Sequence, residues 1–180
     1  MPIAPIVPVV PIVPVVPIVP IVPIVPIEPI APATQRLPYL ELAPAAARGF
    51  HATGEALKAS PLGKMLVHLV FLRVSQINGC AYCVDLHWRD LIAQDADPRR
   101  LNSLCTWREN GLYSARECAA LHWAEVVTNI GLTHAPDADF EALKAHFSDA
   151  EIADLSFAIA LMNAWNRMAI SFRMPVAAQP

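Results

Sequence analysis

The chain has 180 residues, a formal net charge of -3 at pH 7 and four cysteines. This length suits one domain, and the slight acidic balance argues against nucleic acid as a partner. Four cysteines are too few for the dense disulfide framework of a small secreted protein. The start of the chain lacks the positive and unbroken apolar segments of a signal peptide, so we expect a cytoplasmic protein whose thiols stay reduced unless they are catalytic.

The first part of the chain is a proline repeat. Proline occurs at every third position from Pro2 to Pro32, eleven times in all, with Ile, Val and Ala between. Proline removes a backbone donor and clashes with the preceding turn, so this apolar stretch is not expected to span a membrane as a helix. The period matches polyproline II, which would extend roughly 100 Å at about 3.1 Å per residue. We interpret residues 1–36 as a low-complexity tail, disordered or in polyproline II, and residues 37–180 as the folded domain. A spacer or a ligand for an aromatic-lined groove is the alternative interpretation of the repeat.

From residue 40 onward the apolar pattern is helical and predicts an all-α domain of about six to seven helices. Capping boxes at Ser114 and Ser148 mark two helix starts, Ser60-Pro61 marks another, and Asn78-Gly79 marks an end. In chain order the expected helices span residues 41–58, 62–77 and 81–94, a short stretch after Asp97-Pro98, then 115–130, a segment opened by Pro136 or Asp137, and finally 149–172. The first helix is expected to bury Leu42, Ala46, Phe50 and Leu57.

Two cysteines and a histidine stand at the start of the third expected helix. Cys80, Cys83 and His87 have the spacing i, i+3 and i+7, which places them on one helix face. Cysteines three apart at a helix start lie within the Cα separation of a disulfide, about 4.4–6.8 Å. The helix N-terminus favours the thiolate, and a nearby imidazole can accept its proton. The segment can therefore supply a nucleophile, a resolving thiol and a base, as a dithiol peroxidase or disulfide exchanger needs.

Two other interpretations of Cys80, Cys83 and His87 compete with a redox centre. They could bind zinc, although a structural zinc site needs a fourth ligand and no second pair follows at the expected spacing. The cysteines could also be a plain pair of buried residues.

The other candidate residues have simpler interpretations. Tyr82 is expected to pack or to donate its hydroxyl, and Cys105 and Cys118 to be core thiols. We expect His122 and Glu125 to make interhelical hydrogen bonds, with a role near the site as the alternative. Trp165, Asn166 and Arg167 are expected to be core or oligomer contacts, with the lining of a pocket as the alternative, and His51, His134 and His146 to lie at the surface.

The run LRVSQINGCAYCVDLH, residues 72–87, resembles the signature of the alkylhydroperoxidase D (AhpD)-like, carboxymuconolactone decarboxylase superfamily. Similar features are WRE at residues 107–109, AALHWAE at 119–125 and NAWNR at 163–167. The resemblance covers roughly residues 38–175. It implies an all-helical fold and a homo-oligomer, commonly a trimer or a hexamer.

The resemblance also implies roles for individual residues. In redox-active members the second cysteine attacks the peroxide and the first resolves the sulfenic acid, so Cys83 would be peroxidatic and Cys80 resolving and open to an external dithiol. His87 would belong to a proton relay. These members usually carry a glutamate twelve residues before the first cysteine, where this chain has His68. His68 would face the cysteines and could accept a proton near pH 7, or it could be an ordinary semi-buried histidine.

The leading hypothesis is a cytoplasmic peroxidase or thiol–disulfide oxidoreductase that reduces hydroperoxides with an external dithiol. Members that decarboxylate γ-carboxymuconolactone lack the cysteine pair, which argues against that activity here. With no nucleotide loop or flavin fingerprint, we expect no cofactor and no metal. The alternatives are a non-enzymatic redox-switch or binding protein, and a lyase or isomerase that uses His68 or His87 as its acid or base.

Overall fold

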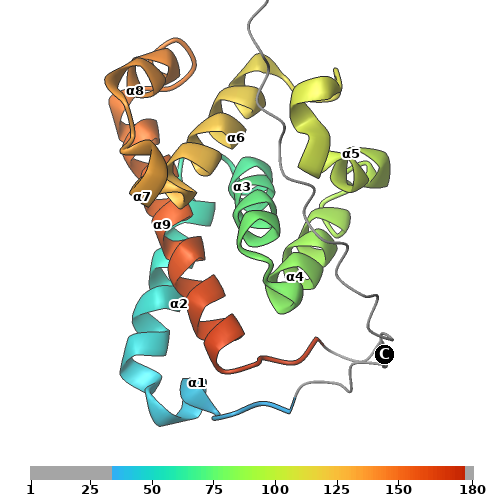
Figure 1. Cartoon of the computed structure of the whole chain (residues 1–180), viewed down its shortest axis with the longest axis vertical. Coiled ribbons are helices and arrows are strands. Elements are labelled where there is room, and N and C mark those ends of the chain that lie inside the picture. The colour runs from blue at the N-terminus through green and yellow to red at the C-terminus, as the bar shows by residue number, and fades with distance from the viewer. Residues whose placement is uncertain (1–33, 177–180) are drawn as a thin grey trace, which may run out of the picture. The chain divides into compact units, whose positions relative to one another are not determined.

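The computed structural model describes residues 34–176, which form helices and loops without strands (Figure 1). This confirms the all-α class. The proline repeat and most of the predicted tail, residues 1–36, lie outside the described residues. The described elements are α1 Tyr39–Leu42, α2 Pro44–Lys58, α3 Lys64–Asn78, α4 Ala81–Ile92, α5 Pro98–Asn102, the 3₁₀ helix η1 Leu104–Glu109, α6 Ala115–Thr128, α7 Ile130–Thr133, α8 Asp137–Leu143 and α9 Asp149–Ser171.

Three of the predicted helix ends are confirmed, at Ser114, Ser148 and Gly79, whereas the start predicted at Ser60-Pro61 is wrong. The hydroxyls of Ser114 and Ser148 accept from the backbone N–H three residues on, and both capping boxes are complete. Gly79 ends α3 in the left-handed conformation with a φ of 70°, which a glycine adopts without steric cost. These signals act within one turn, so the sequence alone is sufficient to place them.

The first expected helix is broken in two. Ala43, with a φ of -127°, leaves the helical region and separates α1 from α2, which begins with Pro44. The break turns Leu42 outward, and its exposed fraction is 64% where burial was expected. The next helix starts at Lys64 instead of residue 62, because Gly63 caps it with a φ of 82° and Ser60-Pro61 stays in the loop.

The helix expected over residues 115–130 also divides. It ends at Thr128, and Asn129 separates it from the short α7. Such short elements explain why the described helices outnumber the six to seven expected.

Helix α3 lies at the centre of the domain and packs against α4, α6 and α9 (Figure 1). It is buried around most of its circumference, as expected of a core helix that is apolar on nearly every face. Its buried residues are Leu66, Val67, His68, Leu69, Val70, Phe71, Leu72, Val74 and Ser75. Two of these, His68 and Ser75, are polar, so each needs a partner or a function to offset its desolvation.

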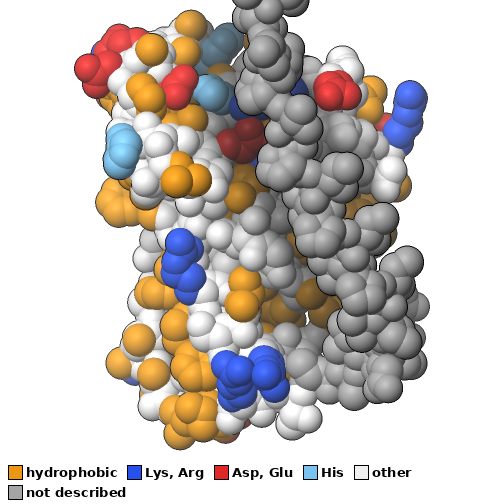
Figure 2. Space-filling model, viewed as in Figure 1, with side chains coloured by type: hydrophobic (Ala, Val, Ile, Leu, Met, Phe, Trp, Pro, Cys, Tyr) orange, Lys and Arg blue, Asp and Glu red, His pale blue; other side chains and the backbone are white. Residues whose placement is uncertain are grey.

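Hydrophobic side chains also reach the surface, and Figure 2 shows them gathering in the lower part of one face. The most exposed large ones are Leu132 at 84%, Leu42 at 64% and Phe157 at 63%. Within residues 34–176, no helix is both long enough and apolar enough to cross a membrane.

Candidate redox site

A disulfide joins Cys80 and Cys83 at the start of α4, with their Cα atoms 5.4 Å apart. Cys80 is the N-cap of α4, and its Sγ accepts from the backbone N–H of Cys83 at 3.3 Å. The backbone N–H of Cys80 donates to the carbonyl of Ser75 at 3.0 Å, and this bond connects the loop before α4 to the end of α3. The cysteine pair therefore stands at a helix start and within disulfide reach, as its spacing predicted.

Both cysteines are buried, with exposed fractions of 1% for Cys80 and 3% for Cys83. Cys83 lines a cavity, whereas Cys80 is not part of its wall. The expectation that Cys80 is open to an external dithiol is therefore wrong for this conformation. The α3–α4 loop folds the first cysteine into the core, so the second cysteine is the one that faces the cavity.

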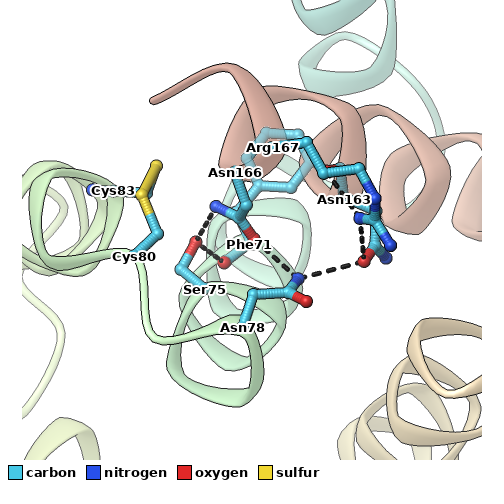
Figure 3. The surroundings of a disulfide bond; sticks show 8 residues. All are labelled: Phe71, Ser75, Asn78, Cys80, Cys83, Asn163, Asn166 and Arg167. Carbon is cyan, nitrogen blue, oxygen red and sulfur yellow. Dashed lines mark hydrogen bonds between the residues drawn. A yellow bond between two sulfur atoms is a disulfide. The ribbon is translucent and has the colours of Figure 1, made fainter. Parts of the chain in front are cut away.

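A polar network lies beside the cysteine pair and joins the end of α3 to α9 (Figure 3). Asn166 of α9, fully buried, donates to the Ser75 hydroxyl at 3.1 Å and accepts from the Asn78 amide at 2.9 Å. The Ser75 hydroxyl donates to the Phe71 carbonyl at 2.7 Å, and Asn78 also donates to Asn163 at 3.0 Å. These bonds join α9 to the end of α3, directly before the cysteine pair.

The cavity beside Cys83 has a volume of about 190 Å³. Its wall is mainly aromatic and apolar, from α1, α2, α3, α4 and α9, and includes Tyr39, Phe50, Phe71, Leu161, Met162 and Trp165. Polar groups line it on two sides. His68, His87 and Asp90 lie on α3 and α4, and His51, Glu55 and Lys58 lie on α2. An apolar chamber with a few convergent polar groups is the usual form of a small-molecule site.

Asp90 connects the two histidines. Its Oδ2 lies 3.3 Å from Nδ1 of His87, one turn before it on α4, and 3.3 Å from Nδ1 of His68 on α3. The imidazole rings are 5.5 Å apart between centroids, and Phe71 packs beside both. Sequence reasoning singled out both histidines but missed Asp90, although its position three residues after His87 was a usable signal.

Burial lowers the pKa of His68 to about 4, against the opposing effect of the Asp90 carboxylate. Its imidazole is therefore neutral near pH 7, and neither ring nitrogen has a hydrogen-bond partner among the described residues. The hydrogen bond from His87 holds the pKa of Asp90 below its usual value, although burial opposes this. The cluster therefore combines a neutral imidazole with an ionised carboxylate.

The two cysteines outside the disulfide and the His122 and Glu125 pair lie away from the cavity. Cys105 is exposed, so its assignment to the core is wrong, because η1 turns it outward; Cys118 is half-buried against the core. The interhelical bonds are confirmed: Nε2 of His122 pairs with Asp139 at 2.9 Å, and Glu125 accepts from the Trp107 indole at 2.8 Å.

The remaining aromatic and polar candidates divide between cavity, core and surface. Trp165 and Tyr82 line the cavity, Asn166 is in the core and Arg167 is exposed. His134 is exposed and His146 half-buried, while His51 is exposed yet lies beside Trp165 at the cavity, which its surface assignment did not predict.

Comparison with known proteins shows which family this sequence belongs to. Residues 44–126 match the carboxymuconolactone decarboxylase family. The uncharacterized protein YdfG of Bacillus subtilis is 33% identical over 138 residues, which cover 77% of this chain and 94% of YdfG. The chain belongs to the carboxymuconolactone decarboxylase family. This confirms the membership that the run at residues 72–87 indicated.

Solved structures place this family member on its AhpD-like side. A protein of unknown function from Agrobacterium tumefaciens, considered a candidate AhpD antioxidant-defence protein, superposes with a TM-score of 0.78 and 38% identity, over 81% of this chain and all of that one. A peroxidase-related protein from Ralstonia eutropha, described as an AhpD core, has a TM-score of 0.69 and 28% identity over 77% of this chain and 74% of its own. The described helices thus form an AhpD-like domain.

Proposed function

We propose that this AhpD-like protein is a thiol-dependent peroxidase, a thiol–disulfide oxidoreductase that reduces hydroperoxides through Cys80 and Cys83. One observation carries the proposal: a disulfide-forming pair at the start of α4 presents its second cysteine to a cavity that also holds His87 and Asp90. The apolar lining suits an organic hydroperoxide, and no step of the reaction needs a cofactor.

The reaction begins with both cysteines reduced. The Cys83 thiolate attacks the distal oxygen of the hydroperoxide, the O–O bond breaks, and the products are a Cys83 sulfenic acid and an alkoxide that takes up a proton. Sulfur of Cys80 then attacks the sulfenic sulfur, so that a disulfide forms and the hydroxyl leaves as water with the Cys80 proton. An external dithiol reduces the disulfide by exchange and is itself oxidised to a disulfide.

The histidines and Asp90 would manage the protons. With Nδ1 of His87 donating to Asp90, Nε2 of the same ring is free to accept the Cys83 proton and to return it to the leaving alkoxide. Asp90 then supplies, from α4, the carboxylate that related proteins carry at the position of His68. We place His68 third in this relay, because its neutral ring lies beside both groups.

The test is peroxide consumption with a dithiol donor, measured for the wild type and for Cys83→Ser. The wild type is expected to turn over with cumene hydroperoxide, and Cys83→Ser to lose this activity. Cys105→Ser, which removes an exposed thiol outside the site, is the matched control and should retain it. Equal rates for the wild type and Cys83→Ser would overturn the proposal.

A second candidate is a redox switch with little turnover. The burial of Cys80 favours it, because an external dithiol has no direct access to that sulfur and reduction would be slow. The same assay separates the two candidates: a switch forms its disulfide once with stoichiometric peroxide and shows no sustained consumption.

We also infer that the protein works in the cytoplasm as a homo-oligomer, a trimer or hexamer by family resemblance. Exposed apolar side chains on α7 and α9, such as Leu132 and Phe157, support an interface between copies.

A further inference from the structure

His68, His87 and Asp90 are arranged as ligands as well as proton carriers. We propose that they form a binding site for a divalent cation of the zinc class, at the α3–α4 wall of the cavity. The site is distinct from the zinc site considered above from the sequence, because neither disulfide cysteine takes part. It shares these three side chains with the relay proposed above, but cation binding needs no redox step and so does not depend on the peroxidase activity.

The distances fit metal coordination. Imidazole nitrogen and carboxylate oxygen bind zinc at about 2.0–2.2 Å, and two such ligands at a tetrahedral angle lie about 3.3–3.5 Å apart. Oδ2 of Asp90 is 3.3 Å from Nδ1 of His87 and 3.3 Å from Nδ1 of His68. One ligand atom from each of the three residues falls within 4.8 Å of the others.

His68 supplies the independent sign of a missing partner. Its side chain is 5% exposed, it lines the cavity, and neither of its ring nitrogens has a hydrogen bond within residues 34–176. Leaving a buried polar group unpaired costs about 1–3 kcal/mol. A cation held between His68, His87 and Asp90 would satisfy a ring nitrogen of His68 directly.

The donor set suits an open site. Two imidazoles and one carboxylate are a ligand set of catalytic zinc sites, in which a fourth position is left for water or substrate. Here the fourth coordination position would face the cavity. The side chain of Asp90 is 39% exposed, so a cation can reach the site from solvent along it. Lys58 lines the same cavity, but it is paired with Glu55, which offsets its repulsion of a cation.

The test uses the full chain with its disulfide formed, titrated with ZnCl₂ by calorimetry and with CoCl₂ by visible absorption, which reports tetrahedral coordination. We expect one cation per chain. His68→Gln and Asp90→Asn should each weaken the affinity by at least about tenfold. His122→Gln, which breaks a histidine–aspartate pair elsewhere, and Cys105→Ser, which removes an exposed thiol, should bind as the wild type does.

Wild-type affinity in both Asp90→Asn and His68→Gln would overturn the site, as would a loss of binding in His122→Gln or Cys105→Ser. If His68→Gln fails to fold by circular dichroism, the less buried Asp90→Asn decides. Binding is read without peroxide, so a failed peroxidase assay leaves this test intact. If both proposals hold, bound zinc occupies the relay, and peroxide consumption should fall with zinc and return with a chelator.

Discussion

The buried amide of Asn166 allows a quantitative prediction for the change Asn166→Ala. The change removes two hydrogen bonds, one to the Ser75 hydroxyl at 3.1 Å and one from Asn78 at 2.9 Å. Each contributes about 1 kcal/mol net. Both partners keep another bond, to Phe71 and Asn163, so neither is left wholly unpaired. The cavity left at a fully buried position adds about 1 kcal/mol. We therefore expect the free energy of unfolding to fall by about 3 kcal/mol.

The measurement is urea unfolding of the disulfide-bonded protein, followed by far-ultraviolet circular dichroism. Wild type and variant must be compared at one protein concentration, because oligomerisation shifts apparent stability. Arg167→Ala is the matched control. Arg167 is the next residue on α9 and is exposed, and it contacts the network only through Asn163, which keeps its bond from Asn78, so this change should alter stability by no more than about 0.5 kcal/mol. If Asn166→Ala is no less stable than Arg167→Ala, the network does not stabilise the base of the loop.

The other two predictions concern acidic residues. Asp90→Asn removes the negative charge beside His87 and should lower peroxide turnover about 10²-fold at saturating dithiol. Asp85→Asn is the control and should leave turnover unchanged, because the Asp85 carboxylate pairs only with exposed Arg89. Equal turnover in Asp90→Asn and the wild type would remove Asp90 from the relay. Burial would raise the pKa of Glu125, but hydrogen bonds from Trp107 and two arginines outweigh it and hold the pKa below 4.5. Its ionised form therefore stabilises the fold above pH 4.5, and this contribution is lost as pH falls through the lowered value. Glu125→Gln should lower the urea midpoint at pH 7 and differ less from the wild type at pH 3.5; an equal difference at both values would contradict this.

Features governed by one turn of chain were predictable from the sequence. The capping boxes at Ser114 and Ser148 and the end of α3 at Gly79 depend on residues no more than four apart, and all lie where expected. The same holds for Cys80 and Cys83, because three residues at a helix start bring two Cα atoms within disulfide range whatever surrounds them.

Exposure was less predictable. Leu42 and Cys105 are apolar residues next to periodic segments, yet both are exposed, because a break at Ala43 and the irregular turn of η1 set their direction. Hydrophobicity indicates that a residue can be buried, but the packing of the chain around it determines whether it is.

The sequence by itself determined the helical class, the family and the presence of a cysteine pair with a histidine one turn beyond Cys83. These follow from periodicity and from a contiguous motif. Only the tertiary structure decided that Cys80 is buried, that Cys83 faces a cavity, and that Asp90 joins His87 to His68. The last of these needs α3 packed against α4, because His68 and Asp90 are twenty-two positions apart and no local rule brings them together.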